Sequence, residues 1–335
     1  MENKQPLLSI CIPTYNRGDI LKENLNYILK LPEFDDSIEI VISDNASTDN
    51  TEEVAKSFTS FYKNIRYYKN ETNVRDANFE LAMNRGNGVY IKLMNDRLTL
   101  TNEGLGYIKS KVQAHILDKR PIFFTNDYIY TKNKAEIIEC NSLDEYVQSI
   151  STYVTLIGIF GAWKEHWESV ENKNQYKDLL LSQDDWCYQI VDRYNGCVIY
   201  DRHIMVDTNV QIGIRSGYNC FEVHLDNYYK ILTPYIESGK VSHQTIKQDK
   251  KYLLKHFIPE LLIIFIYVKK PEFFKYDTSN TLSYFYKYYK KEYYFYLILF
   301  LYPFWYVMFN SLLLMKIIVK KSLILFNNKK YKETI

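Results

Sequence analysis

The chain has 335 residues, 47% hydrophobic and 24% charged, which excludes a disordered protein and allows one large domain with an appendage, or two domains. Its five cysteines, without a CxxC spacing, argue against a disulfide framework or a zinc site and favour reduced thiols. The net charge of +2 is uneven: residues 241–335 carry 16 Lys, no Arg and 6 Asp or Glu, or +10, and the 26 basic and 34 acidic residues before them give −8.

Strand and helix patterns alternate through the first hundred residues. Apolar, β-branched runs predict buried strands, and apolar stripes at helical spacing predict helices, the third of them ended by Gly86. The expected strands lie at 7–13, 38–42, 64–70 and 89–94, and the expected helices at 18–31, 47–58 and 73–86. This alternation predicts an α/β fold whose mostly parallel sheet has helices on both faces.

The pattern is mixed beyond residue 120. The stretch "PIFFTNDYIY" (121–130) predicts a strand, and "YVTLIGIFGAWKEHWE" (153–168) an apolar segment with glycine breaks before a helix start. "SQDDWCYQIVDRYN" (182–195) predicts a helix with two carboxylates in its first turn. From about residue 220 we expect helices that become rich in Tyr and Lys.

The run "YIKLMNDRLT" raises a chemical question. A buried-strand pattern ends in Asn95, Asp96 and Arg97, at the kind of position where open α/β sheets place their ligand chemistry. A metal site there would favour several carboxylates, yet this trio offers one carboxylate between an amide and a guanidinium.

Four segments together resemble the family 2 glycosyltransferases. They are "LSICIPTYNRGDILKENLNYIL", "EIVISDNASTDNTEEV", "NETNVRDANFELAMNRGNGVYIKLMNDRL" and "LSQDDWCYQIV", in about the family's order and spacing. The chain looks closest to the abequosyltransferase-like branch that makes bacterial surface polysaccharides, and the resemblance covers residues 7–230. It implies a GT-A fold, a nucleotide-sugar donor and inversion at the anomeric carbon.

The resemblance places the donor site on the first two strand ends and on a following helix. Tyr15 could stack on a nucleobase, and Asp44 could accept the imide N–H of uracil or thymine; the alternatives are a turn aromatic and a cap of the turn "DNAS". Arg75 stands where the relatives have Gly, and the alternative for its segment is a solvated helix face. The residues expected to bind the nucleotide-sugar are Pro13, Thr14, Tyr15, Asn16, Arg17, Asp44, Asn73, Arg75, Asp76, Asn78, Asn95 and Asp96.

Relatives end the fourth strand in Asp-x-Asp, whose last Asp holds Mg²⁺ or Mn²⁺. Here the aligned positions are Asn95 and Arg97. Arg97 would repel a dication, because two unit charges 4 Å apart interact by roughly 4 kcal/mol at an effective dielectric near 20. We therefore expect Arg97, helped by Arg75, to replace the metal on the diphosphate, so that no cofactor is required. Two alternatives stay open: Asp96 alone binds a metal weakly, or the site is inactive.

By the same resemblance, Asp185 is the general base for the acceptor hydroxyl, and Asp184 orients it or contacts the acceptor. Two carboxylates at a helix start are also ordinary capping chemistry. Retention of both argues against an inactive relative.

The C-terminal region, 231–335, is expected to associate with a membrane or to form a dimer. Tyr293–Met315 is uncharged for 23 residues, contains Pro303 and is flanked by Lys on both sides, so it fits a helix lying in the cytoplasmic leaflet better than one crossing it. We expect residues 285–326 to attach the protein to the membrane; the alternative is packing on the glycosyltransferase domain, 1–230, or on a second copy.

The predicted function is an inverting transferase that moves a sugar, with a UDP-sugar as the expected donor, to a polyprenyl-diphosphate-linked glycan in capsule or O-antigen synthesis. The expected location is the cytoplasmic face of the cell membrane, because the first residues lack the pattern of a secretory leader. The competing class is a non-catalytic scaffold of the same fold. Binding of nucleic acid by the Lys-rich tail is a further class that we do not expect.

Overall fold

The computed structural model describes residues 5–129, 135–207, 218–267, 277, 279–301, 304, 307 and 308. It divides the chain into two compact units: residues 1–213 with 223–249, and residues 214–222 with 250–335. Each unit is described by itself. The domain boundary expected at 230/231 falls inside helix α9 (Tyr228–Glu237), which packs with the first unit.

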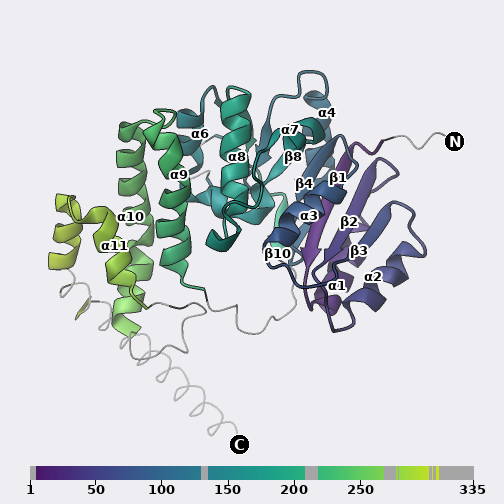
Figure 1. Ribbon diagram of the computed structural model, residues 1–335, viewed down its shortest axis with the longest axis horizontal. Coiled ribbons are helices and arrows are strands. Elements are labelled where there is room, and N and C mark those ends of the chain that lie inside the picture. Colours follow the sequence, from purple (N-terminus) through teal and green to yellow (C-terminus); the bar gives the residue numbers. More distant parts are fainter. Residues whose placement is uncertain are drawn as a thin grey trace, which may run out of the picture. The chain divides into compact units, whose positions relative to one another are not determined.

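The main sheet of the first unit has the strand order β3-β2-β1-β4-β8 (Figure 1). Its strands are β1 (Leu8–Thr14), β2 (Ile38–Asp44), β3 (Ile65–Lys69), β4 (Tyr90–Leu93) and β8 (Gly161–Trp163). The first four pair in parallel, and β8 pairs antiparallel with β4. Every residue of β1, β2 and β4 is buried, as expected for a sheet covered on both faces.

Alternation along β1 assigns its two faces to different helices. Ile10 and Ile12 lie in one apolar core with residues of α1 (Gly18–Ile28), α2 (Thr51–Thr59) and α4 (Gly104–Ala114). Cys11, on the opposite face, lies near Gly86, the residue that follows α3 (Ala77–Arg85). The predicted GT-A-like layering of strands between helices is therefore observed.

Gly86 ends α3 for a reason other than the one expected. Its φ of −68° is not left-handed, so the backbone does not demand glycine there. A Cβ at this position would lie 3.0 Å from both Cys11 Sγ and Ile91 Cγ2. Close packing of the helix end on the sheet accounts for the glycine.

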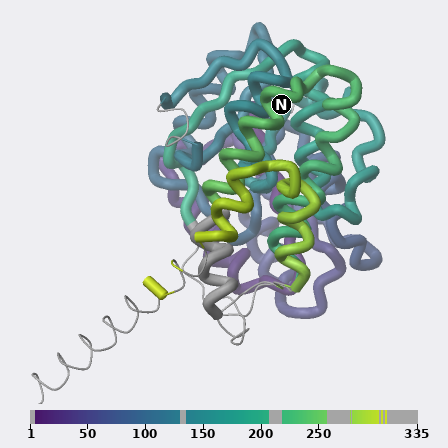
Figure 2. The backbone as a smooth tube through the Cα atoms, turned by 90° about the vertical axis from the view of Figure 1, so that its left-hand side faces the viewer, coloured from purple at the N-terminus to yellow at the C-terminus, as the bar shows by residue number. Residues whose placement is uncertain are grey.

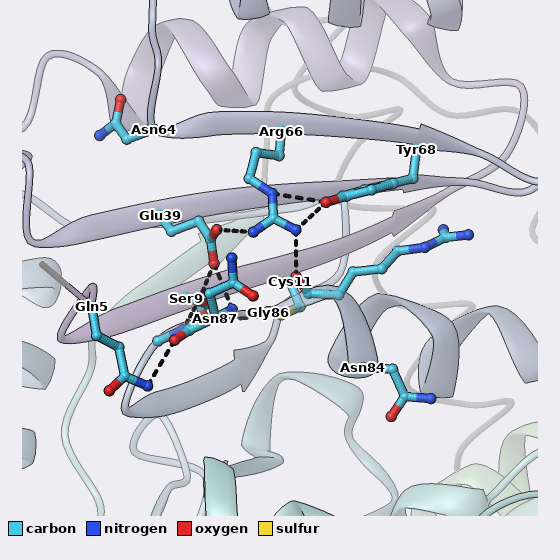
Figure 3. Close-up of polar contacts among 12 residues, drawn as sticks. Gln5, Ser9, Cys11, Glu39, Asn64, Arg66, Tyr68, Asn84, Gly86 and Asn87 are labelled. Atoms are coloured by element: carbon cyan, nitrogen blue, oxygen red, sulfur yellow. Dashed lines mark hydrogen bonds and ion pairs between the residues drawn. The ribbon is translucent and has the colours of Figure 1, made fainter. Parts of the chain in front are cut away.

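A buried carboxylate ties the amino ends of three strands together. Glu39 of β2 is 3% exposed and pairs with Arg66 of β3 at 2.6 Å (Figure 3). It also accepts hydrogen bonds from the Ser9 hydroxyl of β1 and from the Asn87 backbone N–H, the latter at 2.8 Å. These contacts fix strand register at the edge opposite the predicted site.

In the rest of the first unit the expected elements are shorter, and several strands and helices, among them α4 (Gly104–Ala114) and β9 (Cys197–Tyr200), were not predicted. The segment at 121–130 forms a strand only over Ile122–Phe124, and the apolar segment at 153–168 forms two 3₁₀ turns before β8 and α7. The remaining strands are β5 (Leu98–Leu100), β6 (Ile122–Phe124), β7 (Ile137–Cys140), β9 (Cys197–Tyr200) and β10 (Met205–Asp207), and the remaining helices are α6 (Leu143–Ile150), α7 (Lys164–Ser169), α8 (Ser182–Arg193) and α9.

The second unit is helical where it is described (Figure 2). Helix α10 (His243–Tyr267) leads into it, and α11 (Thr281–Tyr289) is followed by a helical stretch at 293–301. Four aromatic rings of this unit are buried and contact one another in series, with centroids 5.2 to 5.9 Å apart: Phe221, Phe285, Tyr289 and Phe295.

The uncharged run Tyr293–Met315 is described only in part. Its first nine residues are helical, and most of those after residue 301 lie outside the described residues. Within the described part of the chain, no helix is both long and apolar enough to cross a bilayer.

Candidate functional site

The strand register brings three predicted segments to one edge of the sheet. Thr14 at the end of β1 pairs with Asp44 at the end of β2, and on its other side β1 pairs Cys11 with Leu93 of β4. The residues that follow β1, β2 and β4 therefore emerge together at the carboxyl edge, as the sequence predicted.

Asp96, just beyond β4, is the most constrained side chain of this edge. It is 1% exposed; its Oδ1 pairs with Arg17 Nη1 at 2.7 Å, and its Oδ2 accepts a hydrogen bond from Thr14 Oγ1 at 2.9 Å. Burial raises the pKa of Asp96, and Arg17 and Thr14 oppose that rise. Arg17 keeps 38% of its side-chain surface exposed, so its guanidinium joins Asp96 to the solvent-facing edge.

These contacts give Asp96 a guanidinium as its charge partner, which opposes a divalent metal at the same oxygens. Both of its carboxylate oxygens are engaged by Arg17 and Thr14, and the Asn95 Oδ1 accepts the Arg97 backbone N–H at 3.0 Å. Across the described ranges, no group of three or more His, Cys, Asp or Glu is arranged to hold a metal. Arg97 is half-buried, and its charge lowers the pKa of Asp96.

Asn24 of α1 supports the same turn and was not predicted. It is fully buried, and its Nδ2 donates to the backbone oxygens of Asp96 at 3.2 Å and Leu98 at 2.8 Å. Its signal in the sequence is a polar residue on the apolar stripe of Leu21, Leu25 and Ile28.

Asp44 fills the alternative role of capping the turn. Its Oδ1 accepts the Ser47 backbone N–H at 2.9 Å, and its Oδ2 accepts the Tyr67 hydroxyl at 2.6 Å. A carboxylate has about four acceptor positions, so the nucleobase contact stays a prediction beside these two bonds. Tyr15, the predicted stacking partner after Pro13 and Thr14, is 43% exposed.

The turn residues after Tyr15 bind the loop that follows β2. The Asn16 backbone N–H donates to Ser47 Oγ at 2.8 Å, and its side-chain oxygen accepts the Thr48 N–H at 2.8 Å. Asn16 has φ = 50°, a left-handed conformation that Asn tolerates well. This loop is thus shaped by polar contacts between the ends of β1 and β2.

The segment before α3 is held in place by Asn45, a residue that was not among those predicted from the sequence. Its Nδ2 donates to Asn73 Oδ1 at 2.9 Å and to the Arg75 carbonyl at 3.2 Å, and its Oδ1 accepts the Val74 N–H at 2.9 Å. Arg75 is exposed with φ = 53°, a left-handed conformation that favours the Gly expected in relatives. The backbone turn is kept, and a guanidinium is added at its surface.

Two other predicted residues of this segment lie deeper. Asn78 is buried; it donates to the Ser43 carbonyl at 2.8 Å and accepts the Ser43 hydroxyl at 2.6 Å, so its amide joins α3 to β2. Asp76 is half-buried, and burial, opposed by Arg75, raises its pKa to about 6.

Asp185, in the first turn of α8, is enclosed by three donors. Its Oδ2 accepts from Gln175 Nε2 and Gln189 Nε2, both at 2.7 Å, and its Oδ1 accepts the Tyr235 hydroxyl at 2.8 Å. It is 2% exposed, and burial raises its pKa while the three donors oppose the rise. None of the three donors was predicted, and Tyr235 comes from α9, fifty positions along the chain.

Asp184 has the opposite surroundings. It is fully buried, and neither of its carboxyl oxygens has a hydrogen-bond partner within the described chain. Burial, reinforced by the charge of Asp185, raises the pKa of Asp184 well above its usual range. Neither carboxylate caps α8, whose N-cap, Leu181, makes no side-chain cap bond. Adjacent carboxyls with divergent environments are an arrangement that separates a neutral acid from an ionised base.

Comparisons with known proteins agree with this architecture. A mostly parallel sheet of this order, with polar side chains at its carboxyl edge, fits the GT-A fold of glycosyltransferases. The Glycosyl transferase family 2 domain matches residues 9–205, so the chain belongs to this family of transferases and the expected resemblance is confirmed.

Among curated relatives, the chain is similar to abequosyltransferase RfbV of Salmonella typhimurium, with 31% identity over 196 residues, 51% of this chain and 56% of the relative. It is also similar to validoxylamine A glucosyltransferase of Streptomyces hygroscopicus subsp. limoneus, with 32% identity over 113 residues, 33% of this chain and 24% of the relative. The matches thus span about half of the first relative's length and about a quarter of the second's.

Two crystal structures share the fold. S. aureus TarS matches with a TM-score of 0.51 and 15% identity, covering 75% of this chain and 43% of TarS. TarS 1–349 in complex with UDP-GlcNAc also gives 0.51, with 18% identity, covering 75% of this chain and 72% of that one. These likenesses confirm the predicted fold class.

Replacing Asp184 by Asn should stabilise the protein increasingly as pH rises. The unfolded chain loses the Asp proton near pH 3.9, but the folded protein keeps it because burial raises the pKa of Asp184. Stability of the parent therefore falls as pH rises above about 4, by up to roughly 1.4 kcal/mol per pH unit, until the folded pKa is reached. Asn carries no such proton.

Urea unfolding at pH 4.5 and 7.5 measures this difference. Asp178→Asn, at an exposed position before the same helix, controls for the substitution itself. An equal change in the free energy of unfolding at both pH values would show that Asp184 is ionised in the folded protein.

Proposed function

We propose that this glycosyltransferase inverts the anomeric carbon as it moves a sugar from a nucleoside-diphosphate sugar to a glycan acceptor. The observation that carries the proposal is the separation of charges at the site. The Arg17 guanidinium pairs with Asp96 at the carboxyl edge, Arg97 follows Asp96 in the chain and its charge acts on the same carboxylate, and Asp185 sits in a cage of donors at the start of α8. The two arginines suit a leaving diphosphate, and Asp185 suits a general base.

In the proposed reaction, Asp185 takes the proton of an acceptor hydroxyl as its oxygen bonds to the anomeric carbon. The bond from that carbon to the diphosphate breaks on the opposite side, and the electron pair leaves with the diphosphate. Arg97 and Arg17 stabilise the charge that develops there, since a guanidinium stays protonated and can donate two parallel hydrogen bonds to phosphate.

The donor and acceptor are proposed from chemistry and from the relatives. UDP-sugars are the first donors to test, because TarS binds UDP-GlcNAc and a buried carboxylate such as Asp44 suits uracil. The similarity to an abequosyltransferase supports a lipid-linked acceptor in synthesis of capsule or O-antigen. A donor panel screened by thermal shift, followed by a transfer assay, tests the class; a protein that binds no nucleotide-sugar is instead a scaffold of the same fold.

Asp185→Asn should lose transfer by about 10²–10⁴-fold, the usual cost of removing a general base, and should bind UDP as the parent does. Asp178→Asn is the matched control in the loop before the helix. Transfer rates come from product release, and UDP affinity from calorimetry. Transfer within tenfold of the parent would remove Asp185 from the role of base.

Transfer should survive EDTA, because the residues around Asp96 fit a guanidinium and not a divalent ion. Arg97→Ala should lower the rate by roughly 10²-fold or more, as loss of one preorganised donor does. Arg202→Ala, a half-exposed arginine paired with Glu103, is the control. If EDTA abolishes transfer and Mn²⁺ or Mg²⁺ restores it, Asp96 holds a metal and must release Arg17.

We also propose that the second unit binds the anionic lipid surface of the cytoplasmic face. Its helical stretch exposes large apolar side chains, among them Tyr293 at 80%, Phe300 at 79% and Phe304 at 63%. Three exposed lysines, Lys287, Lys290 and Lys291, precede them. Aromatic residues beside lysines suit the headgroup layer of an anionic bilayer. The alternative occupant of this surface is a second copy of the chain.

The double variant Tyr293→Ser with Phe300→Ser should release the full chain from phosphatidylglycerol vesicles in a sedimentation assay. Phe61→Ser, which removes a ring 84% exposed in the first unit, should leave binding unchanged. If the parent stays in the supernatant as a dimer and the double variant is a monomer in solution, this surface is instead a dimer interface.

A further inference from the structure

Asp185 is almost closed to substrate in this structure. It is 2% exposed, yet a general base must come within about 2.6–3.2 Å of the hydroxyl that it deprotonates. Its two carboxylate oxygens differ in their partners: Oδ2 is held by two amide groups, Gln175 and Gln189, and Oδ1 by one hydroxyl, that of Tyr235. The Tyr235 O–H thus occupies the kind of position that an acceptor hydroxyl needs.

A polar pocket of about 280 Å³ adjoins this cage. Gln175, Gln189 and Tyr235 each line the pocket and donate to Asp185, so one layer of side chains separates the two. The volume is slightly below the roughly 300–1,000 Å³ of pockets for drug-sized ligands, which suits one sugar ring.

The charges around the pocket are paired with one another. Arg193 pairs with Glu171 at 2.9 Å, and Lys240 pairs with Asp192. The Gln189 amide is engaged by the Glu171 backbone and by Asp185. What remains to meet a ligand is the side-chain amides of Asn172 and Gln175 and the Tyr235 ring. These groups suit a neutral, hydroxyl-rich ligand, because amides both donate and accept hydrogen bonds and an aromatic ring covers an apolar sugar face.

The loop that forms one wall also contacts the helix of the predicted donor segment. Asn174 Nδ2 donates to Glu80 of α3, one turn beyond Asp76. The pocket is therefore connected through this loop to the side of the site where the donor is expected.

We propose that this pocket binds the acceptor sugar, and that Tyr235 is a positioning residue whose hydroxyl holds Asp185 until an acceptor hydroxyl replaces it. The proposal rests on the assignment of Asp185 as the base and adds where the acceptor enters. On binding, the acceptor O–H takes over Oδ1, and the two glutamines keep Oδ2 in place. Tyr235 itself transfers no proton.

The first test is the pKa of Asp185, measured by carbon NMR of labelled aspartates and assigned with Asp185→Asn. Tyr235→Phe removes one of three donors that oppose the effect of burial, so the pKa of Asp185 should rise by roughly 0.5–1 unit, the equivalent of one hydrogen bond. The other titratable groups that face Asp185 are Asp184, Tyr176 and Cys187, and all three are retained.

Tyr229→Phe is the matched control, because it removes a tyrosine hydroxyl on the same helix that bonds Asp249 at 3.0 Å. It should leave the pKa of Asp185 unchanged. An unchanged pKa in Tyr235→Phe would overturn the positioning role.

The second test uses methyl glycosides and UDP as probes in saturation-transfer NMR on the full chain. Glu171→Trp, at the exposed pocket mouth, should weaken the glycoside signal at least tenfold and leave the UDP signal unchanged; Glu168→Trp, outside the pocket, should change neither. Absence of a glycoside signal from the parent, or an unaltered one from Glu171→Trp, would overturn the pocket assignment. If Asp185→Asn still abolishes transfer in that case, the base assignment stands and only the acceptor site is wrong.

Discussion

The carboxyl edge of the sheet depends on the neutralisation of one buried carboxylate, Asp96. A carboxylate that is 1% exposed costs several kcal/mol unless charged or polar partners replace its water. Thr14 and Arg17 supply them from the turn after β1, and so the end of β4 is tied to the start of α1. Loss of that pairing would release both the turn that presents Tyr15 and the turn that presents Arg97.

At the opposite edge of the sheet, Glu39 is a second buried carboxylate whose water must be replaced by polar partners. Its partners, Ser9, Arg66 and the Asn87 N–H, come from neighbouring strands and from the turn before β4, so a second buried carboxylate sets the register there. Strands fixed at both ends hold Thr14, Asp44 and Asp96 at constant positions. The carboxyl edge is thereby organised without a ligand, which is what the proposed stabilisation of a transition state by fixed charges requires.

Local periodicity predicted the first hundred residues of the first unit well and the residues beyond 120 only in part. The strands β1 to β4 and the helices between them were expected at their observed places, because each has an apolar pattern that is complete within a few residues. Local periodicity did not predict the hydrogen-bond and ion-pair partners of the site residues. Arg17 and Asp96 are separated by 79 positions and Asp185 and Tyr235 by 50, and no periodicity relates them. Gly86 shows the same limit, because glycine is needed there for close packing against Cys11 and Ile91, which are distant in the sequence or on another element.

The two carboxyls of "SQDDW" show how position on a helix becomes chemistry. Successive residues point about 100° apart, so Asp184 faces the apolar interior while Asp185 faces Gln189, one turn on, and Tyr235. Burial without partners raises the pKa of Asp184, and three donors oppose the rise that burial causes in the pKa of Asp185. The sequence offers two equivalent acids, and of the two the fold gives hydrogen-bond donors to Asp185, the proposed base.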